Sequence, residues 1–219
     1  NFMKQGWLQA FLPETARGVP AQYIGPDNLW IGYAKDPFVA IYNTNAVPAD
    51  KAPKSWQDLV DPAWRGKTAI SNPAGVNGVS QNLVAALKGG VIDEAWLTKL
   101  AANKPLITPG AGAALQMVAG GQASLSPIIA YQQYLNAKKQ GAPLGYVAPS
   151  EGYAAIPAPI GMLAKAPHPD TAKLLTAWLM TPEAQRLIAD TGQFGTMPGA
   201  PAPSGLPAAR FAATSHAGT

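Results

Sequence analysis

Hydrophobic positions in the middle of the chain alternate between short apolar runs and segments with helical spacing. Strands are expected at residues 37–43, 67–71, 123–128 and 145–148, and the first of these runs has the β-branched and aromatic content of a buried strand. Helices are expected at three segments, each followed by glycine, residues 77–87, 112–119 and 131–139. A further helix begins after Asp93, a residue suited to capping it. From residue 67 to 148 the pattern predicts β-α-α-α-β-α-β, an open α/β layer with helices on its faces.

The ends of the chain give weaker patterns. Residues 2–11 are interpreted as the end of a helix. Two further helices are expected from Pro169 and from Thr181-Pro182, because proline suits the first helical position. In the first of these helices, the buried face is expected to consist of Leu174, Leu175, Trp178 and Leu179.

Prolines mark the segment that precedes these helices. Residues 155–163 are apolar but include Pro157 and Pro159, and proline cannot donate a hydrogen bond to a neighbouring strand. This segment is therefore expected to be an edge or crossing strand. From residue 198 onward the sequence has no sustained period, which predicts an extended tail.

Composition narrows the functional classes. The chain has 219 residues, of which 47% are hydrophobic and 13% charged, against about 25% charged in an average protein. The net charge of +4 is scattered, whereas nucleic-acid binders concentrate basic residues on one face. Cysteine is absent, which excludes disulfides, thiolate nucleophiles and cysteine-ligated metals. The apolar runs are too short to span a bilayer, so an integral membrane protein is not expected.

Enzyme signatures are poor. His168 precedes a helix start, His216 lies in the expected tail, and neither has a nearby serine and acid in a catalytic pattern. The run beginning at Gly110 resembles a dinucleotide-binding fingerprint but places Leu115 where the third glycine belongs. Metal-ligand spacings of His, Asp and Glu are also missing. We therefore expect no enzyme activity, no cofactor and no metal site.

The remaining candidates for ligand binding are the small and polar residues that precede helix starts. The stretch from Ser71 to Ser80 joins a strand to a helix, and its amides, its hydroxyls and the helix dipole are suited to a carboxylate or phosphate. The alternative is an ordinary capped connection in which Asn77 or Gly78 is the cap. The segment from Gly110 to Gly112 repeats the arrangement without a side-chain donor, and the same two interpretations stay open there.

Several ordered motifs carry a resemblance to a known family. They are WIGY (residues 30–33), FVAIYNT (38–44), PKSWQDL (53–59), DPAWRGK (61–67), and a final stretch that runs from His168 through Trp178 to Gln185. In their order and spacing they resemble family 1 extracellular solute-binding proteins of ABC transporters, in the branch similar to ferric-iron-binding proteins. That resemblance implies a type II periplasmic-binding-protein fold, in which two α/β lobes are joined by two crossover strands.

The resemblance also implies a division of the chain. Residues 1–43 would end lobe 1 and form the first crossover strand, and residues 44–153 would form lobe 2. Residues 154–197 would cross back and place their helices on lobe 1, and residues 198–219 would form the tail. Family members begin with a further β-α-β-α unit ahead of the counterpart of Asn1, so lobe 1 is expected to be incomplete in this chain.

The expected ligand departs from the iron-binding branch. The two tyrosines that ligate iron in that branch correspond to Ile128 and Ile129, and a third tyrosine corresponds to Tyr131. Ferric iron prefers phenolate and carboxylate oxygens, which isoleucine lacks. A small organic anion of the carboxylate, phosphonate or phosphate type is expected instead. The predicted binding residues are Ser71, Asn72, Asn77, Gly78, Ser80, Ser126, Ile128, Tyr131 and, on the crossover, Tyr33.

By this resemblance the chain is expected to be the solute-binding receptor of an ABC importer. Permease and ATPase subunits are the implied partners, together with a periplasmic or exported cell-surface location. Two alternatives stay open. One is a ferric-iron receptor that uses ligands outside this chain together with an external anion. The other is a ligand-sensing domain of the same fold.

Overall fold

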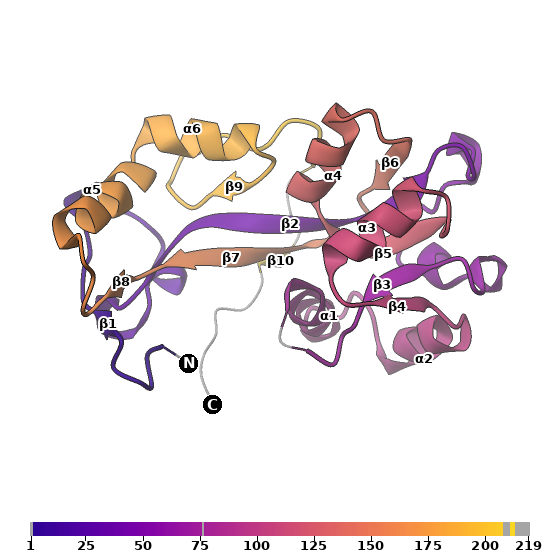
Figure 1. The fold of residues 1–219 in the computed structure, drawn as a ribbon, viewed down its shortest axis with the longest axis horizontal. Helices are drawn as coiled ribbons and strands as arrows, with labels where there is room; N and C mark the ends of the chain where they lie inside the picture. Colours follow the sequence, from indigo (N-terminus) through magenta and orange to yellow (C-terminus); the bar gives the residue numbers. More distant parts are fainter. Residues whose placement is uncertain (1, 76, 208–210, 213–219) are drawn as a thin grey trace. The chain divides into compact units, whose positions relative to one another are not determined.

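The structure is a computed structural model that describes residues 2–75, 77–207 and 211–212 (Figure 1). The chain divides into two compact units, which are described separately below. Unit 1 comprises residues 2–36 and 157–205, and unit 2 comprises residues 37–156, 206–207 and 211–212. Two strands run through both units: β2 (Ile31–Asn43) divides between Asp36 and Pro37, and β7 (Ala154–Ile160) between Ile156 and Pro157.

The strands of unit 2 form an α/β layer. β3 (Ala69–Ser71) pairs in parallel with β4 (Leu106–Thr108), and a parallel bridge from Thr68 to Leu125 joins β3 to β5 (Leu125–Ala130). The unit 2 part of β2 pairs antiparallel with both β5 and β6 (Leu144–Val147). β10 (Phe211–Ala212) pairs in parallel with the start of β7.

Four α-helices cover this layer, and their starts follow the capping rules. Their bounds are α1 (Gly78–Lys88), α2 (Glu94–Ala102), α3 (Ala111–Ala119) and α4 (Tyr131–Lys139). The Asp93 carboxylate accepts a hydrogen bond from the Trp96 amide at 2.7 Å, which confirms the predicted cap of α2. Three short 3₁₀ turns complete the unit, Ala49–Lys51, Asp58–Val60 and Pro62–Trp64.

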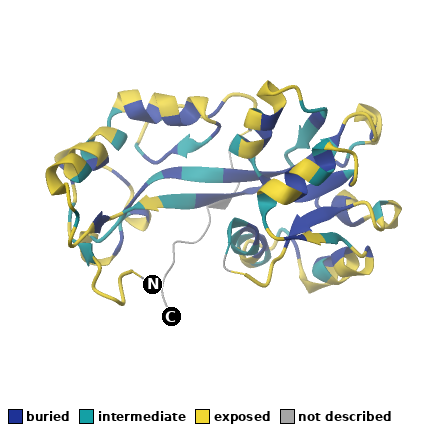
Figure 2. Cartoon of the chain, viewed as in Figure 1, coloured by how far each residue is buried: buried dark blue, intermediate teal, exposed yellow. Residues whose placement is uncertain are grey.

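The core of unit 2 lies between α1, α2 and the sheet. Ile70 and Ile128 from the strands are 1% exposed, and they cluster with Leu83 of α1 and Trp96 of α2. The Trp56 and Trp96 rings meet edge to face with centroids 5.6 Å apart, and the Trp96 indole donates to the Trp56 carbonyl. Figure 2 shows the strands of this unit as mostly buried.

Unit 1 has less regular structure in its described residues. β1 (Leu8–Gln9) pairs antiparallel with β8 (Met162–Leu163), and β9 (Phe194–Gly195) pairs with the unit 1 part of β2. Its helices are α5 (Pro169–Leu179) and α6 (Pro182–Asp190), which begin at the predicted prolines. Its 3₁₀ turns are Glu14–Ala16, Ala21–Tyr23 and Pro26–Asn28. A small core contains Ala16, Val19, Tyr23, Ile31 and Met180.

Two predictions about these elements are wrong wholly or in large part, and one strand was missed. Residues 2–11 form a turn and β1 rather than a helix end. Most of the face of α5 that was expected to be buried is exposed: Leu174 is 70% exposed, Leu175 49% and Trp178 39%. Of that face only Leu179 is half-buried and packs against the unit 1 core, and Thr176 is the buried residue of this helix. β4 was not anticipated, because three residues that include the exposed Ile107 are too short to show a period.

The expected tail is only partly extended. Leu206 is buried, and the Tyr153 hydroxyl donates a hydrogen bond to the Pro207 carbonyl, so these residues pack on unit 2. Residues 208–210 and 213–219 of the expected tail lie outside the described residues.

Candidate functional site: helix N-termini at one edge of the unit 2 sheet

Three helices of unit 2 begin at the same edge of its sheet. β3, β4 and β5 run parallel, so their carboxyl ends share one edge. α1 follows β3 after a loop, α3 follows β4 after two residues, and α4 begins directly after β5 (Figure 1). Ligands of open α/β sheets bind outside the carboxyl ends of the strands, which makes this edge the candidate site.

The N-terminus of α1 is capped by its own sequence. The Asn77 side-chain oxygen accepts hydrogen bonds from the Val79 and Ser80 amides at 2.9 and 3.1 Å. The Ser80 hydroxyl accepts from the Asn77 amide at 3.1 Å and donates to the Asn77 carbonyl, which completes a capping box. The Asn77 side-chain nitrogen donates to the Asn72 carbonyl at 2.9 Å. The capped connection, left open by the sequence, is therefore the observed arrangement.

Two other residues of this loop also have local roles. The Asn72 side chain accepts a hydrogen bond from the Ala74 amide at 3.0 Å. At Gly78, an added Cβ would lie 2.7 Å from Cζ of Phe38, a ring buried on β2. The small size of Gly78 is thus explained by core packing, whereas the sequence analysis had placed Gly78 among the predicted binding residues.

α3 and α4 begin without such caps. Neither Gly110 before α3 nor Ala130 before α4 supplies a side-chain cap, and neither first turn contains an acidic residue. The first intrahelical bond of α3 runs from the Ala114 amide to the Gly110 carbonyl, so the amides of residues 111–113 precede it. Thr108 holds the loop in place by donating to the Gly110 carbonyl at 2.9 Å. These helix starts carry positive partial charge without a carboxylate to balance it.

A tyrosine cluster lies beside the start of α4. The Tyr131 ring is 3% exposed and lies 5.6 Å from the Tyr134 ring and 5.1 Å from the Tyr146 ring. Burial, and after it the neighbouring Tyr146 and Tyr134, raise the pKa of Tyr131 to about 12. Burial also raises the pKa of Tyr134 and of Tyr153. Burial therefore opposes ionisation of the Tyr131 phenol, which is the form in which tyrosine ligates a metal.

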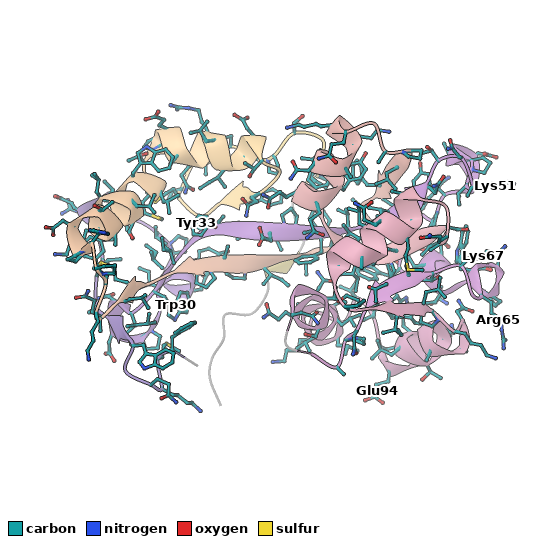
Figure 3. The ribbon with its side chains drawn as sticks, viewed as in Figure 1. Trp30, Tyr33, Lys51, Arg65, Lys67 and Glu94 are labelled. Carbon is teal, nitrogen blue, oxygen red and sulfur yellow. The ribbon has the colours of Figure 1, made fainter. Side chains whose placement is uncertain are left out.

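The remaining predicted site residues lie on strands. Ser71, Ser126 and Ile128 are at most 2% exposed, and Ile128 belongs to the core cluster. The expectation that Ile128 contacts a solute is therefore replaced by a packing role. Tyr33 lies on the unit 1 part of β2, where burial and the nearby Asp36 raise its pKa (Figure 3).

The difference between the starts of α1 and α3 is visible in the sequence. Asn77 is a strong capping residue, whereas Gly110 and Ala130 have no side-chain acceptor. Sequence reasoning gave most weight to residues 71–80 because they contain polar side chains. In the structure those side chains bind their own backbone, and the uncapped amides belong to the apolar helix starts.

Neither a metal cluster nor a membrane span is found in the part of the chain that the structure describes. No group of three or more His, Cys, Asp or Glu residues is placed there to hold a metal ion. None of the described helices is long and apolar enough to cross a bilayer. His168 directly precedes α5 and makes no capping hydrogen bond, while His216 lies outside the described residues.

Comparisons with known proteins identify the class. Solved structures of periplasmic binding proteins share the fold, so the chain has the type II periplasmic-binding-protein fold. Residues 1–214 match the family described as bacterial extracellular solute-binding protein. The chain belongs to this family, which confirms the resemblance found in the sequence. The family is one of transport receptors rather than enzymes, in agreement with the poor enzyme signatures.

Individual relatives differ in what they bind. The chain is 27% identical over 197 residues to the Fe(3+)-binding periplasmic protein of Serratia marcescens, covering 82% of this chain and 55% of that protein. Iron-bound HitA from Pseudomonas aeruginosa has a TM-score of 0.72 at 24% identity, over 94% of this chain and 69% of its own. AfuA from Actinobacillus pleuropneumoniae, with fructose-6-phosphate bound, has a TM-score of 0.73 at 21% identity, over 92% of this chain and 67% of its own.

The chain covers only part of the length of each of these proteins. The chain spans about half the length of the Serratia protein and about two thirds of each of the two solved chains.

Proposed function

We propose that this chain belongs to the solute-binding receptor of an ABC importer and binds a small organic anion of the carboxylate, phosphonate or phosphate type. The observation that carries the proposal is the contrast among the helix starts. α1 is capped by Asn77, whereas α3 and α4 begin without side-chain caps at the same sheet edge. Uncapped helix N-termini are sites at which proteins bind anions.

The chemistry of this edge suits an anion better than a cation. The first turns of α1, α3 and α4 contain no acidic residue, and backbone amides offer only donors. Each hydrogen bond to a charged group contributes about 1.5–3 kcal/mol of net stabilisation. A phosphate or phosphonate presents more oxygens than a carboxylate, so it can accept from amides of both α3 and α4. Fructose-6-phosphate bound to AfuA supports an organic phosphate among these candidates.

Transport of ferric iron is the second candidate, and it is favoured by the names of two relatives. The Serratia protein is named Fe(3+)-binding, and HitA is iron-bound. Against iron, Ile128 and Ile129 are at most 1% exposed in the core of unit 2. The burial of Tyr131, which opposes ionisation of its phenol, and the lack of an acidic cluster among the described residues also argue against it. An iron site would therefore need ligands from outside this chain together with an external anion.

Delivery of the solute would depend on closure of the protein around it. A solute that contacts two lobes stabilises the closed state by the difference between its contacts in the closed and open states. Tyr33, on the unit 1 part of β2, stays a proposed binding residue by the family resemblance. Permease and ATPase subunits are the proposed partners and the periplasm the proposed location, as for the periplasmic relatives. A ligand-sensing domain of the same fold is the rival role.

Identification of the retained solute tests the proposal. The purified protein is denatured, and the small molecules released are analysed by mass spectrometry. Release of an organic acid, phosphonate or phosphate ester supports the anion, and release of a cationic or uncharged solute contradicts it. Addition of ferric citrate gives the second arm, because iron bound through phenolate oxygens produces a visible charge-transfer band. We expect no such band, and its appearance would establish the iron alternative.

A further inference from the structure

Helix α5 of unit 1 has apolar residues on two opposite sides. On its inner side Thr176 is buried, and Leu179 packs against the small core of the unit. On its outer side Leu174, Leu175 and Trp178 are all exposed. These three residues share one face, because neighbouring helix positions differ by about 100° and positions four apart nearly coincide. A surface helix has one apolar side, whereas a second apolar side is typical of a helix that lies between two layers.

Exposed apolar side chains are concentrated in unit 1. Among the described residues, the exposed large apolar side chains of unit 2 are Val84 and Ile107. Besides the three on α5, those of unit 1 are Phe2, Met3, Trp7, Leu12, Leu163 and Leu187. Leu163 belongs to β8, which contacts α5, so exposed apolar residues continue beyond the helix (Figure 1). Unit 1 therefore leaves apolar surface uncovered, and surface of this kind marks a site of interaction.

The length of the solved chains indicates what covers this surface. HitA and AfuA share the fold over nearly all of this chain, yet about a third of each solved chain has no counterpart in these 219 residues. Domains are built from packed layers, and unit 2 already has helices over its sheet, whereas α5 has nothing on its outer side among the described residues. A second copy of this chain would not supply the absent third of the fold.

We propose that the outer face of α5, formed by Leu174, Leu175 and Trp178, is the surface on which a further segment of the same protein packs. This segment is apolar where it contacts the helix. The surface is independent of the candidate anion site, which belongs to unit 2. The proposal explains why the sequence pattern predicts a buried face that the structure leaves exposed. The pattern corresponds to two covering layers, and these 219 residues contain one of them.

Hydroxyl-radical footprinting, applied to the mature protein expressed from its complete reading frame, tests the proposal directly. We expect Leu174 and Trp178 to be oxidised severalfold more slowly than Val84 and Ile107, after correction for the reactivity of each residue type. The two controls are 50% and 56% exposed in unit 2 and should stay reactive. Equal corrected rates would overturn the proposal, and so would a reading frame that adds no further segment. This measurement needs no variant, so it does not depend on the folding of one.

A second copy of the protein is the competing occupant of this face. Sedimentation velocity at the labelling concentration separates the two, because protection by a second copy requires a dimer. We expect a monomer in which α5 is protected. A dimer that Leu174→Asp dissociates, with protection lost on dilution, would overturn the proposal in favour of self-association.

Denaturant unfolding of the mature full-length protein gives the second test. Leu174→Ala should raise the unfolding equilibrium constant about tenfold or more, because it opens a cavity under the covering segment. Val84→Ala is the matched control, since Val84 is an exposed apolar residue on α1, and it should change the constant by less than about twofold. Similar small changes for both variants would contradict the proposal. In the 219 residues alone, where the face is uncovered, Leu174→Ala should have little effect.

Discussion

Helices with similar apolar patterns are buried to different extents in unit 2 and in unit 1. α1 in unit 2 buries Val79, Leu83 and Ala86 against a sheet. α5 in unit 1 also has leucines and a tryptophan at helical spacing, yet Leu174 is 70% exposed. Figure 2 shows this helix as mostly exposed. The comparison shows that periodicity predicts which side of a helix is apolar, whereas burial also depends on a layer that packs against it.

The two units also differ in the surroundings of one carboxylate each. Asp36 of unit 1 is partly buried, and its main interaction is a hydrogen bond from Gln193. Asp58 of unit 2 is exposed and accepts hydrogen bonds from the Lys54 and Ser55 amides at 2.9 and 3.1 Å. Burial without an opposite charge destabilises a carboxylate, and amide donors stabilise it.

The largest difference between the units is expected from large-to-small substitutions. Ile128→Ala should destabilise the protein by about 2–5 kcal/mol, because it opens a cavity in the core of unit 2. Leu174→Ala on the exposed face of α5 should change stability by less than about 0.5 kcal/mol. Denaturant unfolding of both variants provides the comparison. Equal losses would mean that the α5 face is packed in solution.

A smaller effect is expected from the cap of α1. Asn77→Ala removes the acceptor for the Val79 and Ser80 amides and should cost about 0.5–2 kcal/mol of stability. Asn72→Ala is the control, because this side chain accepts only from Ala74 in the preceding loop. Thermal unfolding measures both changes. If the Asn77 side chain binds solute instead of these amides, Asn77→Ala should leave stability unchanged and weaken the affinity for solute.

The smallest effects are expected from pH, with opposite signs in the two units. Burial raises the pKa of Asp36, so its ionisation destabilises the fold as pH rises through the raised value. Asp36→Asn should therefore gain relative stability toward neutral pH. The amide bond from Lys54 lowers the pKa of Asp58, so its stabilisation is lost as pH falls through the lowered value.

Asp58→Asn should accordingly lose relative stability at neutral pH and approach the unsubstituted protein in acid. Denaturant midpoints measured from about pH 3 to pH 7 separate the two behaviours. Parallel pH profiles for the two variants would contradict the assigned environments. The Asp58 effect should be modest, because this carboxylate is exposed to screening by solvent.

Much of unit 2 could be predicted because its signals are local. The Asp93 cap of α2 and the bounds of α4 follow from residues within one or two helical turns. Unit 1 was predicted less well because its signals depend on distant partners. Residues 2–11 contain helix-compatible leucines, but Leu8 pairs with Leu163, and nothing near Leu8 in the sequence indicates that partner.

The helix starts of the candidate site were predicted, but their hydrogen bonds were not. The sequence indicated helix starts at Asn77 and Gly110, and both lie at the strand edge where ligands of this fold class bind. It could not show that the side chains of Asn77 and Ser80 would bind each other's backbone. It also could not show that Ile128 faces the core, because strand alternation leaves the choice of face open.

The central claim is that backbone amides at the start of α3 hold the anion. Ala111→Pro removes one such amide, and proline suits both this first helical position and the extended conformation of Gly110 before it. Glu94→Pro is the matched control at the start of α2, where the labelled Glu94 points away from the protein (Figure 3).

Titration calorimetry with inorganic phosphate and with fructose 6-phosphate compares these two variants with the unsubstituted chain. The account predicts that Ala111→Pro weakens binding by about tenfold or more while Glu94→Pro leaves it unchanged. Equal affinities for all three proteins would contradict it.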